Sequence, residues 1–195
     1  MQICFATHNQ NKAAEIRALL PEGLELITLK EIGQNEEIPE TGKTLEENSE
    51  IKARFVFEKF NIPCFSDDTG LEVSALNGEP GVYSARYAGD QKDNEANINL
   101  LLSNLERKSD RSAAFKTVIT YLDQEGNRSQ FVGEAHGEII HDRTGEEGFG
   151  YDPIFKPSGF EITFAQMTKE EKNAISHRGR AFKKFIGHLN RFKKE

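Results

Sequence analysis

The sequence of 195 residues has no tryptophan, only two cysteines, and no apolar run close to the ~18 residues needed to cross a membrane. Its first apolar stretch, Met1–Ala6, is too short for a signal peptide and has no basic residues before it. Cys4 and Cys64 lie far apart and show no CxxC or zinc-type spacing. We therefore expect reduced core thiols in a cytoplasmic protein that has no membrane partner.

Basic residues are fewer than acidic ones: the 25 Lys and Arg and the 32 Asp and Glu give a net charge of −7. Nucleic-acid binding requires clustered Lys and Arg, so this balance argues against nucleic acid as the main partner. The acid-free, basic segment 179–194 is an exception. It is most simply the solvated face of a helix whose Phe182 and Phe185 turn inward.

Fourteen phenylalanines can fill an ordinary core, and the length is that of a single domain spanning 1–195. Helical and strand-like patterns alternate early, and two long strands follow in the middle, which predicts an α/β fold with a mixed sheet. The expected strands are 2–6, 24–28, a segment leading to Asp67, 71–76, 113–122 and 129–140, the last two antiparallel. The expected helices are 9–20, 44–60 with Thr44 and Glu47 forming a capping box, 94–105, and one or two from 168 onward.

The most informative segment is Ser66–Leu71, where Asp67 and Asp68 follow an apolar stretch and precede a Thr-Gly pair. Neighbouring side chains on a strand point to opposite faces, so the two carboxylates cannot pair in the core. Asp and Gly are typical turn residues, and we expect the chain to leave the sheet here. One carboxylate would then face a cleft, where it could hold Mg²⁺ or activate water. Glu40 either adds a carboxylate to the same metal or is a solvated loop acid.

The segment Thr7–Lys12 lies at a strand-to-helix turn, which offers free backbone N–H groups and the positive end of the helix dipole. These features favour phosphate, and Lys12 adds a charge one turn into the helix. The alternative is that Thr7 or Asn9 simply caps the helix, and the two interpretations are compatible.

Two further segments carry candidate binding residues. The glycines around Phe149 would let a planar ligand approach the backbone, with Phe149 stacked on a base and Asp152 accepting from ring N–H groups or sugar hydroxyls. The alternative is a hairpin with Phe149 in the core. Between two helical stretches, Lys172, His177 and Arg178 form a polar cluster with Ser176; Ser176 could instead cap the last helix, and the basic residues could pair with surface acids.

Together, these segments resemble the inosine triphosphate pyrophosphatase family in order and over nearly the whole chain. The matching stretches are Thr7…Asn9…Lys12, Glu40-Thr41-Gly42, Glu47-Asn48, Asp67–Leu71, Pro80–Gly89, Gly148–Pro153 and Ser176–Gly179. The Ser-Ala-Arg-Tyr-Ala-Gly and Ser-His-Arg-Gly stretches are the most specific. The resemblance implies an elongated mixed β-sheet flanked by helices, two lobes with the active-site cleft between them, and a homodimer.

The resemblance also implies roles for individual residues. Asp68 would be the catalytic carboxylate and a Mg²⁺ ligand, with Glu40 as a second ligand and Asp67 in support. The implied contacts to a purine nucleoside triphosphate are Thr7, His8, Asn9, Gln10, Asn11, Lys12, Thr69, Phe149, Gly150, Tyr151, Asp152, Lys172, His177 and Arg178.

The implied reaction hydrolyses non-canonical purine nucleoside triphosphates such as ITP, dITP and XTP to the monophosphate and pyrophosphate, which cleanses the nucleotide pool. Mg²⁺ and cations would neutralise the phosphate oxygens. Donor-only groups such as Arg and a protonated His suit a 6-keto oxygen and disfavour a 6-amino group. The alternatives are a Maf-like pyrophosphatase acting on modified pyrimidine nucleotides and a non-catalytic module that binds purine nucleotides.

Overall fold

The computed structural model describes residues 2–192. Its strands and α-helices, in chain order, are β1 (Gln2–Phe5), α1 (Gln10–Arg17), β2 (Glu25–Thr28), α2 (Leu45–Phe60), β3 (Cys64–Val73), β4 (Pro80–Gly81), α3 (Asn94–Asn104), β5 (Ser112–Leu122), β6 (Arg128–Ile139), β7 (Phe155–Pro157), α4 (Lys169–Ile175) and α5 (His177–Phe192).

The strands form a mixed sheet in the order β2-β1-β3-β5-β6-β7, with β4 paired to β3. β1 runs parallel to β2 and β3, whereas β4 is antiparallel to β3 and β7 is antiparallel to β6. The short turn between the neighbouring strands β5 and β6 makes that pair an antiparallel hairpin, as expected. The predicted α/β class with a mixed sheet is therefore confirmed.

Strand β3 corrects one expectation. The sequence pattern predicted that the chain leaves the sheet at Asp67–Gly70 and resumes as a strand over 71–76. Instead, β3 runs without a break through Asp67, Asp68, Thr69 and Gly70 and ends at Val73. β3 pairs with β1 before this point, with β4 after it, and with β5 as its other neighbour in the sheet, so sheet pairing outweighs the local turn preference of Asp and Gly.

The described chain divides into two compact units. Unit 1 comprises residues 2–68, 117–133 and 179–192, and unit 2 comprises 69–116 and 134–178. The boundary on β3 falls between Asp68 and Thr69. Each unit has its own hydrophobic core, so each is described separately below.

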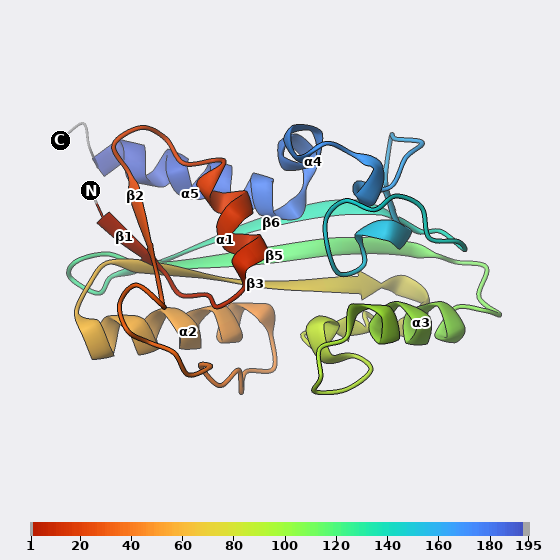
Figure 1. The fold of residues 1–195 in the computed structure, drawn as a ribbon, viewed down its shortest axis with the longest axis horizontal. Helices are drawn as coiled ribbons and strands as arrows, with labels where there is room; N and C mark the ends of the chain where they lie inside the picture. The colour runs from red at the N-terminus through yellow and green to blue at the C-terminus, as the bar shows by residue number, and fades with distance from the viewer. Residues whose placement is uncertain (1, 193–195) are drawn as a thin grey trace. The chain divides into compact units, whose positions relative to one another are not determined.

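In unit 1, helices lie on both sides of β1 and β3: α2 on one side, and α1 and α5 on the other (Figure 1). The alternation along β3 follows this arrangement. Phe65 packs in the core that includes α1 and α5, whereas Cys64 packs in the core that includes α2. Ser66 bonds to Ser49 of α2. Because side chains alternate along a strand, Asp67 follows Phe65 toward α1 and Asp68 follows Ser66 toward α2.

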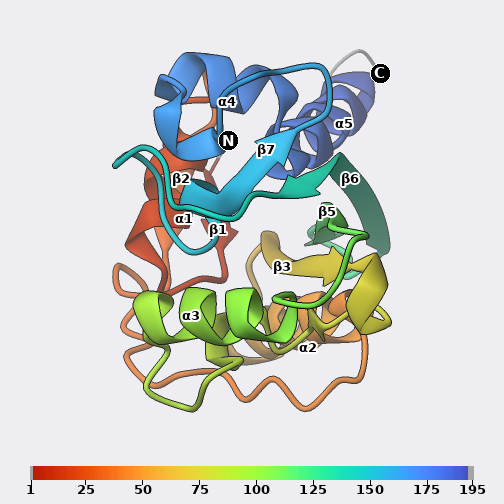
Figure 2. The same ribbon diagram turned by 90° about the vertical axis from the view of Figure 1, so that its right-hand side faces the viewer.

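In unit 2, the core is built around Leu71 and Val73 of β3 and contains residues of α3, β5, β6 and β7. Helices α3 and α4 lie on opposite sides of the strands of this unit (Figure 2). Phe115, Phe155 and Phe164 pack together with ring centroids 4.8–6.1 Å apart. Phenylalanine thus supplies the aromatic packing in a chain that lacks tryptophan.

The predicted helices are present with changed ends. α1 ends at Arg17 rather than at Leu20. The Thr44 hydroxyl caps α2 by accepting from the Glu47 N–H, but the Glu47 carboxylate accepts from the N–H of Lys43, so the expected capping box is only half formed. Within residues 2–192, no helix is both long and apolar enough to cross a membrane.

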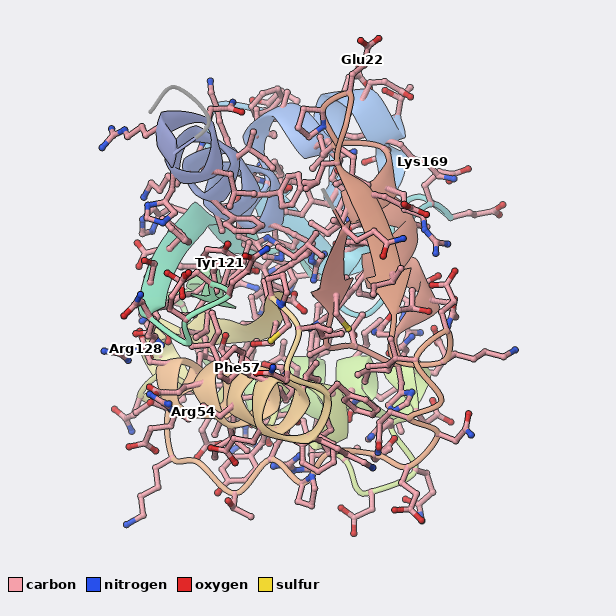
Figure 3. All side chains as sticks on the ribbon, turned by 90° about the vertical axis from the view of Figure 1, so that its left-hand side faces the viewer. Glu22, Arg54, Phe57, Tyr121, Arg128 and Lys169 are labelled. Atoms are coloured by element: carbon pink, nitrogen blue, oxygen red, sulfur yellow. The ribbon has the colours of Figure 1, made fainter. Side chains whose placement is uncertain are left out.

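Helix α2 is attached to the β5–β6 hairpin at its exposed edge. Glu50 pairs with Arg54 of the same helix and with Arg128 of β6, each at 2.7 Å. The Gln130 side chain of β6 donates to the Glu46 carbonyl. Figure 3 labels Arg54 and Arg128 on this side of the protein. Exposed ion pairs contribute little stability, so the position of α2, which carries a central part of the candidate site, depends mainly on its buried face.

Candidate functional site

A buried lysine joins two of the predicted carboxylates in unit 1. The Lys52 Nζ of α2 lies 2.6 Å from Glu40 Oε1 and 3.1 Å from Asp68 Oδ1. The side chains of Lys52 and Asp68 are 11% and 10% exposed, and that of Glu40 is 31% exposed. The carboxylates of Glu40 and Asp68 therefore converge on one cationic group.

The surroundings shift the ionisation of this cluster. Burial raises the pKa of Asp68 and outweighs the nearby Lys52 and Lys12, which lower it. For Lys52, burial acts to lower the pKa, but the carboxylates of Asp68, Glu40 and Asp67 outweigh it and the pKa is raised. Lys52 therefore stays charged at neutral pH, and Asp68 is a stronger base than an exposed aspartate.

The segment that carries Glu40 has no regular secondary structure and is held on the first turns of α2. The Gly42 N–H donates to Asn48 Oδ1 at 2.8 Å, and the Asn48 side chain is fully buried. A Cβ at position 42 would lie 2.7 Å from both Asn48 Oδ1 and the Glu47 Cβ. This close approach requires glycine and keeps Glu40 beside Lys52.

Asp67, on the other face of β3, pairs with the predicted phosphate-binding segment. Its Oδ1 lies 3.0 Å from Lys12 Nζ, and its side chain is 1% exposed. Asn9 caps α1, because its Oδ1 accepts from the N–H groups of Asn11 and Lys12. The capping interpretation of Thr7–Lys12 is thus confirmed, and phosphate binding by this segment stays a prediction.

The other members of that segment lie at the surface or against a neighbouring loop. Thr7 Oγ1 accepts from the Asn9 N–H, and His8 Nε2 lies 2.9 Å from the Glu36 carbonyl oxygen. Gln10 and Asn11 are exposed in the first turn of α1.

In unit 2, a buried carboxylate organises the turn that carries Phe149. Asp152 Oδ2 accepts from the Phe149 N–H at 2.8 Å and from Lys172 Nζ at 2.7 Å. Gly148 has φ +80°, and a Cβ there would lie 2.1 Å from Asp152 Oδ2. Gly150 also has positive φ, at +61°. The arrangement gives Asp152 a role in shaping the turn, which the sequence pattern did not predict; its predicted contact with a ligand stays a prediction.

Two cations lie over the Phe149 ring. Lys172 Nζ lies 5.0 Å and Arg178 Cζ 5.5 Å from the ring centroid. Arg178 also donates to Thr69 Oγ1 at 3.3 Å, and both Lys172 and Arg178 are buried. Thr69, Phe149, Lys172 and Arg178 are therefore brought together as one group, and the substrate contacts expected of each stay predictions. The stacking of a planar ligand on Phe149 stays a prediction.

His177 and Tyr151 are also buried in unit 2. The His177 ring stacks on Phe115 with centroids 4.6 Å apart. Tyr151 donates from its hydroxyl to the Ser84 carbonyl at 2.9 Å. Both side chains thus pack within the core of the unit, and the direct ligand contacts predicted for them stay predictions.

The carboxylates of unit 1 fit a metal bound jointly with a substrate. Within residues 2–192, no group of three or more His, Cys, Asp or Glu side chains is arranged to hold a metal ion. Mg²⁺ usually takes one or two carboxylates together with substrate phosphates. Glu40 and Asp68 are two carboxylates that share one cationic partner, so their number suits Mg²⁺, and metal binding by them stays a prediction.

Comparison with known proteins identifies the family. The model of the Ham1 family matches residues 3–188. A protein from Christiangramia forsetii named dITP/XTP pyrophosphatase is 53% identical over 191 residues, which cover 98% of this chain and all of the relative. The chain belongs to the Ham1 family. A Flavobacterium johnsoniae protein of the same name is 54% identical, over 95% of this chain and 96% of that protein.

A solved Ham1 structure has the same fold. The Ham1 protein from Coxiella burnetii superposes with a TM-score of 0.90 at 38% identity, over 98% of this chain and 99% of that one. The comparisons thereby confirm the predicted family resemblance of this chain and its mixed sheet with flanking helices.

Lys52 was not predicted as a site residue from the sequence. Its signal was its position, because it shares the buried face of α2 with Leu45, Asn48 and Val56 at helical spacing. A lysine at an inward-facing position implies a buried carboxylate partner.

Proposed function

We propose that this chain hydrolyses non-canonical purine nucleoside triphosphates (ITP, dITP and XTP) to the nucleoside monophosphate and pyrophosphate. The observation that carries the proposal is the near full-length similarity, at 53–54% identity, to proteins named dITP/XTP pyrophosphatase. The side chains described above are chemically suited to that reaction.

The residues of unit 1 suit the phosphate chemistry. Asp68 would orient the attacking water or accept its proton, and the raised pKa of Asp68 makes it a better base near neutral pH. Lys12 and Lys52 would neutralise phosphate charge. Glu40 and Asp68 would hold Mg²⁺, which when bound supplies Lewis-acid stabilisation of charge on the phosphate oxygens.

The residues of unit 2 suit a 6-keto purine. Lys172 and Arg178 lie over the Phe149 ring on which a base would stack, and both side chains only donate hydrogen bonds. A 6-keto oxygen accepts such bonds, whereas the 6-amino group of ATP leaves the donors without an acceptor. Thr69, bonded to Arg178, would contact the same substrate.

The experiment is an assay of the purified protein with ITP, dITP, XTP, ATP, GTP, UTP and CTP, with and without Mg²⁺, that identifies the products. We expect pyrophosphate and monophosphate from the first three nucleotides. Release of orthophosphate without pyrophosphate would refute the reaction, and preference for pyrimidine nucleotides would point to the Maf-like alternative. Stoichiometric binding without turnover would indicate a binding module.

Asp68→Asn should abolish turnover without loss of folding. Glu50→Gln makes the same chemical change at the exposed edge of α2 and is the matched control, with activity retained. Equal activity in the two variants would remove Asp68 from its proposed role. We also propose, from the resemblance, that the chain acts as a single domain and forms a homodimer, which light scattering of the purified protein would measure.

A further inference from the structure

The segment Pro80–Gly89 is one of the most distinctive parts of the sequence, yet none of its residues has a role in the proposed reaction. It belongs to unit 2 and follows β3 closely, because Gly81 of β4 pairs with Leu71 of β3. Leu71 is two residues after Thr69. The segment therefore lies against the part of β3 that carries a proposed substrate contact.

The Ser84 hydroxyl is inserted between the two strands. Its Oγ accepts from the Leu71 N–H at 2.8 Å and donates to the Gly81 carbonyl at 2.6 Å. Ser84 is 8% exposed. A serine side chain thus completes the β3–β4 pairing beyond Thr69, and its loss would leave the buried Leu71 N–H without its acceptor.

The backbone of the same residue holds the Phe149 turn. The Tyr151 hydroxyl donates to the Ser84 carbonyl at 2.9 Å, and Tyr151 is 4% exposed. Burial raises the pKa of this hydroxyl, so it remains a donor. Ser84 therefore contacts β3 through its side chain and the Phe149 turn through its carbonyl.

Helix α3 fixes the segment from a third direction. Asn97, which is 2% exposed, accepts from the Ala88 N–H at 2.7 Å and donates to the Ala85 carbonyl at 3.0 Å. The residues that follow Ser84 are thus bonded to α3.

We propose that Ser84 is a positioning residue that, together with Tyr151, sets the position of Phe149 relative to Thr69 for the base of the substrate. Arg178 is a second link between Phe149 and Thr69, because it donates to Thr69 and lies over the Phe149 ring. Ser84 acts through Leu71 and Tyr151 and does not touch the substrate. The proposal rests on the proposed function for its catalytic consequence, but its structural part can be tested without it.

The test compares Ser84→Ala and Tyr151→Phe with the matched control Tyr87→Phe. Tyr87 lies in the same segment, and its hydroxyl bonds to Glu79 and Asn104 instead of to Ser84. We expect Ser84→Ala and Tyr151→Phe to raise KM for ITP about fivefold, the effect of one neutral hydrogen bond, with kcat changed less than about twofold. Tyr87→Phe should leave both constants unchanged. Ser84→Thr keeps the hydroxyl and should have the KM of the wild type.

Hydrogen–deuterium exchange of residues 147–152 supplies a readout that does not depend on activity. Exchange there should become faster in Ser84→Ala and Tyr151→Phe and stay unchanged in Tyr87→Phe. Unchanged exchange in the first two variants would overturn the proposal. Faster exchange with an unchanged KM would refute the link to the base. A wild-type protein that does not hydrolyse ITP would refute the proposed function, while the exchange measurement would still decide whether Ser84 holds the turn.

Discussion

Replacing Lys52 with methionine tests the buried carboxylate–lysine cluster directly. Methionine keeps most of the side-chain length but removes the ammonium that contacts Glu40 at 2.6 Å and Asp68 at 3.1 Å. Asp68, at 10% side-chain exposure, then has a buried charge without this partner. Removing one partner of a buried ion pair typically costs ~3–5 kcal/mol.

Protonation of Asp68 sets a limit on that cost. Converting a carboxylate of ordinary pKa 3.9 to its neutral form requires about 4 kcal/mol at pH 7 and about 1.5 kcal/mol at pH 5, at 1.36 kcal/mol per pH unit. The buried charge of Asp68 cannot lower the unfolding free energy of the variant by more than this amount, because the carboxylate takes up a proton once its burial in the charged form costs more. Without Lys52 the pKa of Asp68 rises further above its unfolded value, so the variant gains stability relative to wild type as the pH falls. We expect a loss in unfolding free energy of about 3–4 kcal/mol at pH 7 that shrinks to about 1.5 kcal/mol at pH 5.

Urea unfolding of both proteins at pH 5, 6 and 7 measures the difference. Lys59→Met is the matched control on the same helix, because the Lys59 ammonium bonds the neutral Gln34 at 2.7 Å and lies over Phe55 and Phe60. Its cost should be about 1 kcal/mol and independent of pH over this range. A Lys52→Met variant as stable as wild type at pH 7, or a loss that does not change with pH, would refute the reasoning.

Three further predictions concern the Phe149 turn and the two thiols. Asp152→Asn should raise KM for ITP about tenfold, because an amide holds the Lys172 ammonium less strongly than a carboxylate does; steady-state kinetics at constant Mg²⁺ would contradict this by showing an unchanged KM. Gly148→Ala should give a similar loss through a displaced turn, since its Cβ would overlap Asp152, and a crystal structure with an unmoved turn would disprove it. Burial, assisted by Glu31 for Cys4 and by Cys4 for Cys64, raises the pKa of each thiol to about 12. The stability this contributes is complete below about pH 8.5, the ordinary thiol value, and falls above it by up to ~1.4 kcal/mol per pH unit for each thiol; urea unfolding from pH 8 to 10.5 should show this fall in wild type and a smaller one after Cys4→Ala and Cys64→Ala are combined.

Local patterns were sufficient to predict most of the fold. The apolar spacing and the Thr44 cap placed α2, and the two long strands of the hairpin lie within one residue of their expected ends. The expected break at Thr69–Gly70 was wrong because turn preference is a local property, whereas pairing with β1 and β4 involves distant parts of the chain.

The candidate site was only partly predictable for the same reason. Lys172 and Arg178 were expected in one polar cluster, and both lie over the Phe149 ring, but the convergence of that cluster on Phe149 was not foreseen. The bond between Lys52 and Glu40 joins an irregular segment to a helix, and no local pattern specifies where such a segment will lie. The Ser84 contacts likewise depend on how distant segments pack.

The unbroken strand β3 has a consequence for how the chain can change in length. Cys64 is fixed opposite its partner Cys4 on β1, and successive side chains from there alternate between α2 and α1. Deleting or inserting one residue between Cys64 and Asp67 would turn each carboxylate to the opposite face of β3. Asp68 would then face Lys12, and Asp67 would face Lys52. Only an even number of added or removed residues preserves the assignment. Whether the number of residues from Cys64 to Asp67 is even or odd therefore decides which of the two acids faces α2.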